Sequence, residues 1–137
     1  MGVRREGREH AVQALYALEL NPAPPRIALG LFWENNRCQA SAREFARELV
    51  NGYLENKESI DALISANSSN WSLGRMAKID LCIIRLAVYE LVFRPEIPRN
   101  VTINEAIEIS KKFGSEESPA FVNGILDEVS RGLTEKQ

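Results

Sequence analysis

The stretch from residue 79 to residue 93 contains neither glycine nor proline, and its only charged residues are Asp80, Arg85 and Glu90. A segment this apolar predicts a helix that is buried on nearly all sides, either among other helices or in a bilayer. Its uninterrupted apolar pieces are far shorter than the roughly 18–20 residues that a membrane span requires. We therefore expect a central core helix over residues 78–93. Its charges should be paired or lie near an end, because an unpaired buried charge costs several kcal/mol.

The length and charge of the chain limit what kind of protein it can be. Its 137 residues are expected to form one domain, and its formal net charge of −2 argues against coating nucleic acid by bulk charge. Any nucleic-acid site must therefore be local. The first residues form no apolar signal region, so we expect a cytoplasmic protein. Cys38 and Cys82 lack a metal-binding spacing and are expected to be inert thiols.

Residues 8–20 predict an amphipathic helix that ends at Asn21-Pro22. Its apolar residues recur at the helical spacing i, i+3, i+4 and i+7, and they are Ala11, Ala14, Leu15 and Leu18. At about 100° per residue, Tyr16 lies on the side opposite this stripe, together with Arg5 and Glu9. Tyr16 is therefore expected to lie outside the core.

Proline and capping signals predict the other helices. Pro24-Pro25 suits the first turn of a second helix, and Ser118-Pro119 suits the start of the last one. Two capping boxes predict further helix starts, and they are formed by Ser41 with Glu44 and by Thr102 with Glu105.

Three glycines have positions that require an interpretation. Helical periodicity on both sides overrides the turn signal of Asn51-Gly52. Gly114 is expected to end a helix in the left-handed conformation. Gly124, inside the last helix, indicates close approach of another backbone or a ligand, with packing between helices as an equal alternative. No strand pattern appears, so the sequence predicts an all-α bundle of about seven helices in a single domain, residues 1–137.

The residues that common catalytic sites require are missing. The chain has one histidine, His10, and neither a glycine-rich phosphate loop nor a His-Glu-x-x-His motif. Glu116 and Glu117 are adjacent at a helix start, where the helix dipole favours solvated carboxylates without any acid–base role. We expect no enzyme, no cofactor, no catalytic residue and no metal site.

Arginines and a tyrosine near the start of the chain indicate a local RNA site. Arg4, Arg5 and Arg8 are expected on an exposed, flexible lead-in to the first helix, whose outer face carries Tyr16. Guanidinium groups bind phosphate and stack on bases, and a tyrosine ring adds a stacking surface, so this combination suits single-stranded RNA.

Five segments together resemble one known family. They are RREGREHAVQALY at 4–16, IRLAVYEL at 84–91, INEAIE at 103–108, KFG at 112–114 and FVNGILD at 121–127. In this order, over nearly the whole chain, they resemble the bacterial transcription antitermination factor NusB family.

The resemblance implies an all-helical, non-enzymatic factor that binds the boxA element of nascent ribosomal RNA together with the ribosomal protein NusE. It also implies action on the RNA polymerase elongation complex with other Nus factors, by a monomer or a homodimer. By position, the family's RNA-binding residues fall on Arg4, Arg5, Arg8, Tyr16, Asp80, Glu117 and Phe121. Glu6 and Gly7 interrupt the denser arginine run of relatives. With few cations available, RNA binding is expected to be modest and salt-sensitive.

Two alternatives remain at this point. One is a helical adaptor that binds only protein. The other is the NusB-like domain of an RNA cytosine methyltransferase, although 137 residues leave no room for a methyl-donor domain. Residues 80–85 and 103–113 are the expected partner surface.

Overall fold

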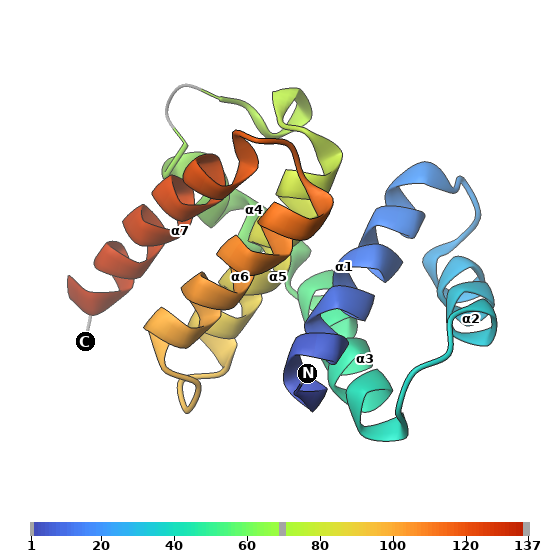
Figure 1. The fold of residues 1–137 in the computed structure, drawn as a ribbon. Coiled ribbons are helices and arrows are strands. Elements are labelled where there is room, and N and C mark those ends of the chain that lie inside the picture. The colour runs from blue at the N-terminus through green and yellow to red at the C-terminus, as the bar shows by residue number, and fades with distance from the viewer. Residues whose placement is uncertain (1, 69–70, 136–137) are drawn as a thin grey trace.

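The computed structural model describes residues 2–68 and 71–135, and over these residues the chain forms seven α-helices and no strand. The helices are α1 Val3–Leu20, α2 Pro25–Asn35, α3 Ala40–Glu55, α4 Lys57–Ala66, α5 Lys78–Phe93, α6 Arg99–Phe113 and α7 Ser118–Glu135. A short 3₁₀ helix, η1 Leu73–Arg75, precedes α5. The predicted all-α fold is confirmed (Figure 1).

Helix α5 is the centre of the bundle. It packs against α1, α3, α4, α6 and α7, and every residue from 80 to 91 is buried. In the part of the chain that the structure describes, no helix is both long and apolar enough to cross a membrane. The interpretation of residues 78–93 as a core helix is therefore confirmed. The same burial contradicts the expectation that residues 80–85 form a partner surface.

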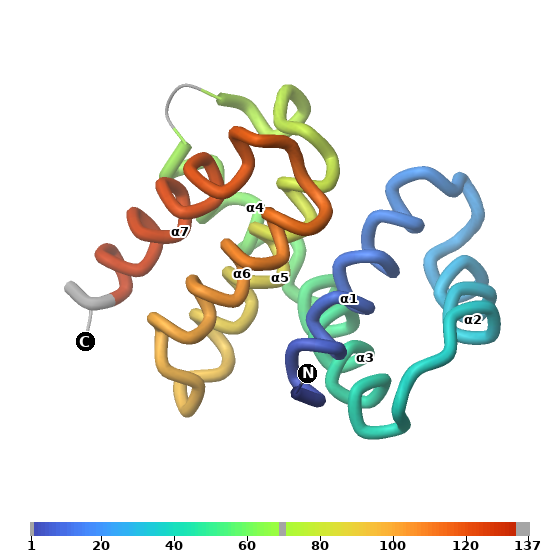
Figure 2. Tube along the Cα trace, in the orientation of Figure 1, coloured from blue at the N-terminus to red at the C-terminus, as the bar shows by residue number. Residues whose placement is uncertain are grey.

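Two ion pairs give the direction of α5 relative to α1. Arg8, in the second turn of α1, contacts Glu90 near the end of α5, whereas Glu19 near the end of α1 contacts Arg85. The two helices are thus antiparallel, and the start of α5 lies at the end of the molecule remote from Arg8. Helix α2 lies on the outer side of α1, away from α7 (Figure 2).

The buried charges of α5 are paired, as expected, at two of three positions. Arg85 donates to both oxygens of Asp61, at 3.0 and 3.1 Å, and to Glu19 at 2.7 Å. Glu90 accepts from Arg8 and from Thr102. These pairs connect α5 to α1, α4 and α6, so the central helix is oriented by charge as well as by apolar packing.

Both predicted capping boxes are wrong. Helix α3 begins at Ala40 after Gln39, and α6 begins at Arg99 after Pro98, without a side-chain cap in either case. Pro98 pre-sets a helical φ for the turn ahead of Thr102. The Thr102 hydroxyl is then free to donate to Glu90, 3.0 Å away.

The two glycine interpretations for the last helices also need correction. Gly114 is extended, with φ −96° and ψ −167°, and not left-handed. It is nevertheless well suited to a glycine, because a Cβ there would lie 2.4 Å from the Ser118 hydroxyl oxygen. Gly124 is exposed, and a Cβ there would meet nothing within 4 Å. Close approach of another backbone and packing between helices are therefore both wrong for the described residues, and approach of a ligand stays a prediction.

Candidate nucleic-acid interface

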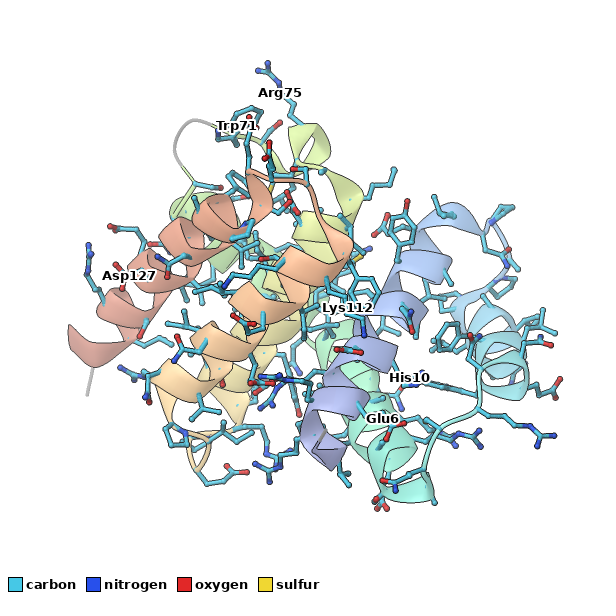
Figure 3. All side chains as sticks on the ribbon, viewed as in Figure 1. Glu6, His10, Trp71, Arg75, Lys112 and Asp127 are labelled. Atoms are coloured by element: carbon cyan, nitrogen blue, oxygen red, sulfur yellow. The ribbon has the colours of Figure 1, made fainter. Side chains whose placement is uncertain are left out.

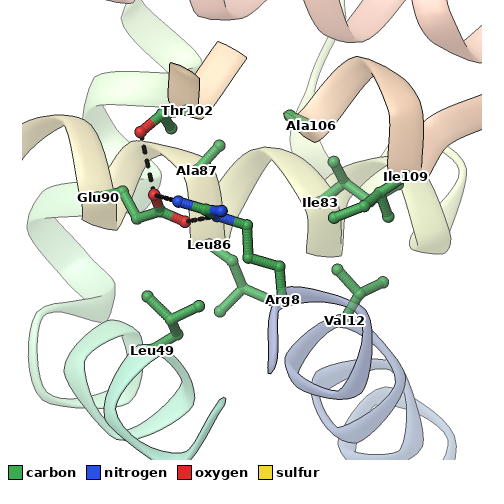
Figure 4. Close-up of a pocket in the computed structure, with 10 residues that line it drawn as sticks. All are labelled: Arg8, Val12, Leu49, Ile83, Leu86, Ala87, Glu90, Thr102, Ala106 and Ile109. Carbon is green, nitrogen blue, oxygen red and sulfur yellow. Dashed lines mark hydrogen bonds and ion pairs between the residues drawn. The ribbon is translucent and has the colours of Figure 1, made fainter. Parts of the chain in front are cut away.

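The N-terminal arginines are part of a helix and not of a flexible lead-in, because α1 begins at Val3. Arg8 is only 6% exposed, and its Nε and Nη2 atoms each donate to the Glu90 carboxylate at 2.8 Å (Figure 4). The expectation that Arg8 is exposed is therefore wrong. The reason is the central helix itself, because the buried carboxylate of Glu90 requires a cation and Arg8 supplies it.

Arg5 and Arg4 differ in how far their charge is already neutralised. Arg5 donates to both oxygens of Glu105 on α6, at 2.9 and 2.6 Å, and its side chain is 40% exposed. This bond, more than any other interaction, holds the pKa of the Glu105 carboxyl below its usual range. Arg4 is exposed, lies 5.4 Å from the centre of the Phe45 ring, and has no carboxylate partner among the described residues. Of the three arginines, Arg4 is the one free to bind a phosphate.

Tyr16 lies between the two ends of this face of α1. It is half-buried against the core, so the prediction that it lies outside the core is only partly correct. Its hydroxyl has no hydrogen-bond partner within the described ranges. It lies eleven residues beyond Arg5, which is about three turns or roughly 16 Å along α1.

Lys112 of α6 pairs with Glu9 of α1 at 2.8 Å, on the side of the molecule that faces the viewer in Figure 3.

The three remaining predicted residues, Asp80, Glu117 and Phe121, come together in one hollow of about 300 Å³. It lies where η1, the start of α5 and the start of α7 meet, and it is also lined by Trp71 and Arg75. These two side chains lie together at one end of the molecule, opposite the start of α1 (Figure 3). Residues that are 41 positions apart in the sequence, from Asp80 to Phe121, thus share one site.

Aromatic rings form one wall of the hollow. Trp71 is 47% exposed, and its ring packs edge-on against Phe121, with ring centres 6.1 Å apart and an interplanar angle of 82°. The Arg75 guanidinium lies 5.9 Å from the centre of the Trp71 ring. Such a wall can stack on a planar group and offer a cation to an anion beside it.

Asp80 supplies the polar end of the hollow. The side chain is in the first turn of α5, and the residue is only 7% exposed. Its Oδ1 atom is buried and accepts no hydrogen bond from the described residues. A buried acceptor without a donor is costly, so an incoming N–H group is favoured there. Among the three buried charges of α5, Asp80 is the one that forms no ion pair with the described residues.

Trp71 and Arg75 were not predicted as site residues, because they lie in a short connector before α5. A tryptophan with an arginine four residues later was the available signal. Cys82 is buried, as predicted for a core thiol, whereas Cys38 is only half-buried. Burial raises the pKa of the Cys82 thiol to about 12, and the described residues contain no cluster of three or more metal ligands.

A helical bundle that presents stacking rings, an unpartnered carboxylate and a free arginine has the features of a protein that binds a planar, anionic ligand. The chain belongs to the NusB family, because the family model matches residues 5–131. It is 54% identical to the transcription antitermination protein NusB of Geobacter sulfurreducens over 99% of each chain. It is 51% identical to the NusB of Myxococcus xanthus, over 97% of this chain and 98% of the relative.

Solved structures agree with this assignment. The NusB structure of T. maritima has a TM-score of 0.83 and 39% identity, covering 93% of this chain and 90% of that one. A second structure, of antitermination factors NusB and NusE in complex with double-stranded RNA, has a TM-score of 0.83 and 25% identity, covering 95% and 97%. Membership of this family confirms the expectation of a non-enzymatic factor.

Proposed function

We propose that this chain is a transcription antitermination factor that binds boxA RNA of nascent ribosomal transcripts together with NusE, as a single RNA-binding domain. The observation that carries the proposal is the hollow at the start of α5. It is lined by two aromatic rings and by Asp80, whose buried Oδ1 atom has no donor among the described residues. The NusB–NusE–RNA complex of a relative supports the choice of RNA and NusE as partners.

The hollow suits a nucleobase better than a phosphate. Two of its three charged lining residues, Asp80 and Glu117, are acidic and repel the RNA backbone, and only Arg75 is basic. A carboxylate instead accepts a hydrogen bond from the amino group of a base such as cytosine. Trp71 and Phe121 provide the apolar wall on which an unstacked base of a single strand can stack. Asp80 therefore contributes specificity and the rings contribute affinity.

Helix α1 carries the strand away from the hollow. Tyr16 offers a further ring, and Arg4, with the more exposed part of Arg5, offers phosphate contacts at the far end. The 18 residues of α1 span about 27 Å, enough for several extended nucleotides. Arg8 has a structural role in this arrangement. Its bonds to Glu90 fix α1 against α5 and thereby position the other side chains of α1 for RNA.

The wider assignment follows from the family. We propose that the protein acts in the cytoplasm on the RNA polymerase elongation complex, with other Nus factors. A titration of boxA RNA with and without NusE tests the function. We expect weak, salt-sensitive binding to boxA alone and tighter binding in the presence of NusE. Binding of NusE without any binding of boxA RNA would favour the protein-only adaptor instead.

A further inference from the structure

Arginines without acidic partners gather on α2, α3 and the link between them. They are Arg26, Arg37, Arg43 and Arg47, and none of the four makes an ion pair within residues 2–68 and 71–135. By contrast, Arg5, Arg8 and Arg85 are all held by carboxylates. On a chain with a formal net charge of −2, such a group is a local concentration of free positive charge.

Three of these arginines line two adjoining hollows. Arg43 and Arg47 line one of about 270 Å³, together with Glu44. Arg47 also lines a second hollow of about 330 Å³, which it shares with Arg26 and Trp33. The first hollow is lined by residues of α3 alone, the second lies between α2 and α3, and Arg47 belongs to both. The groove between α2 and α3 is thus the second hollow, extended along α3 by the first. Helix α2 lies on the outer side of the bundle (Figure 2).

Two features of Arg43 favour an anion in the first hollow, although Glu44 also lines it. Arg43 and Arg47 are one helical turn apart, where like charges repel each other. Arg43 donates through Nη2 to the Trp33 carbonyl at 3.3 Å, but its Nε atom is buried and has no partner in the described part of the chain. An anion between these guanidinium groups would relieve both conditions.

We propose that the groove between α2 and α3 is a second RNA surface, which binds the single strand that flanks boxA. Arg26 and Arg47 bind phosphates, and Trp33, half-buried between them, stacks on a base. The proposal rests on the proposed function, since the RNA must first be held at α1 and the hollow beside Asp80. Arginines beside an aromatic ring are the combination that binds single strands without sequence preference.

The first turn of α1 connects the two surfaces. The Arg4 guanidinium lies 5.4 Å from the Phe45 ring of α3, and Gly7 packs against Ala42. The start of α1 therefore lies beside the start of α3 (Figure 1). A strand that leaves α1 at Arg4 continues past this point to Arg43 and Arg47. An acidic peptide would meet the same arginines but would make no use of the Trp33 ring.

The experiment compares boxA RNA with the same RNA extended by about eight uridines at either end. Only one of the two extensions, the one joined to the end of boxA that lies at Arg4, can reach the groove. For the wild-type protein, this extension is expected to increase the affinity for the RNA by up to about tenfold at low salt. It should also steepen the salt dependence by about 1.4, for two phosphates at roughly 0.7 each. The double variant Arg26→Gln/Arg47→Gln should lose this gain and keep its affinity for unextended boxA.

The control variant removes the same formal charge elsewhere. Lys57→Gln/Arg131→Gln changes two exposed cations on α4 and α7 and should retain the gain from the extension. In a Trp71→Phe background, Trp33 is the only tryptophan, and its fluorescence should be quenched by extended RNA and not by boxA alone.

Each contrary result has a distinct meaning. If neither RNA binds wild-type protein, the proposed function itself fails. If boxA binds and neither extension adds affinity, the second surface is refuted while the proposed function stands. If the control variant also loses the added affinity from the extension, the effect comes from the net charge of the protein and the proposal is overturned. If the groove binds an acidic peptide such as poly-glutamate but not the RNA extension, the groove belongs to a protein partner and the proposal is overturned.

Discussion

Arg8 of α1 and Glu90 of α5 are joined inside the protein by two parallel N–H···O bonds of 2.8 Å each, and the Thr102 hydroxyl of α6 donates to the same carboxylate at 3.0 Å (Figure 4). Helix α1 and the consecutive helices α5 and α6 thus meet at one carboxylate. Bidentate pairing of this kind fixes orientation as well as distance. Arg8 therefore determines where the neighbouring Arg4 and Arg5 lie.

Replacing Arg8 with alanine is expected to destabilise the fold by about 3–5 kcal/mol, because Glu90 would be left buried without its cation. Urea unfolding at pH 7 measures this. Arg4→Ala is the control and should change the free energy of unfolding by less than about 0.5 kcal/mol. The double variant Arg8→Met/Glu90→Met should recover most of the loss, since apolar residues of similar size replace a buried pair at little cost. A wild-type unfolding curve for Arg8→Ala would contradict this role.

The Arg5–Glu105 pair should make the free energy of unfolding depend on pH. The Arg5 hydrogen bond lowers the pKa of the Glu105 carboxyl in the folded protein. Its contribution is therefore complete above the unfolded pKa of about 4.3 and is lost as the pH falls through the folded-state pKa. Glu105→Gln should be less stable than wild type at pH 7, and the difference should shrink below about pH 4. A difference independent of pH would contradict the pairing; Glu108→Gln, on the exposed side of α6, is the control.

Arg4 should contribute to RNA binding through charge alone. Arg4→Ala is expected to weaken RNA binding and to reduce the salt slope by about 0.7, the value for one phosphate contact on a single strand. Binding measured at several salt concentrations tests this. Arg5→Ala should have a smaller effect on the slope, because Glu105 already neutralises that guanidinium. If the salt dependence of RNA binding has the same slope for wild type and Arg4→Ala, Arg4 does not contact a phosphate.

In the hollow at the start of α5, Trp71 should contribute to RNA affinity and Asp80 to the preference for particular bases. Trp71→Ala should lose roughly 1–3 kcal/mol of RNA binding, as expected for one stacked base. Asp80→Ala should mainly lose the preference for a base with an amino group, by about 1–3 kcal/mol, which competition between cytosine- and uracil-containing RNA can measure. Phe93→Ala, an exposed ring at the other end of α5, is the control and should bind RNA like wild type.

Tyr16 should act through its ring. Tyr16→Ala is expected to lose about 1–3 kcal/mol of RNA binding, whereas Tyr16→Phe should bind almost normally, because the hydroxyl has no partner among the described residues. Binding and thermal unfolding are measured on both variants. If Tyr16→Ala melts at a much lower temperature but binds RNA normally when folded, the residue belongs to the core.

Local sequence patterns determined the helices of this protein and the burial of its centre. Apolar spacing placed the Ala11–Leu15 stripe and the helix over residues 78–93, because a buried helix surface needs apolar side chains at fixed intervals. The sequence also led to the expectation that the charges of this helix are paired or lie near an end, since an unpaired buried charge is too costly.

Tertiary structure alone decided which residues meet. Arg8 was predicted to be exposed because nothing in its local sequence indicates Glu90, which lies 82 residues away. Asp80 and Phe121 share a hollow only because the starts of α5 and α7 lie at the same end of the bundle. Thr102 and Ser41 carried equal capping signals, yet one donates to a buried carboxylate and the other is exposed. Periodicity specifies how a helix buries one face, whereas pairing between distant side chains depends on how whole helices pack.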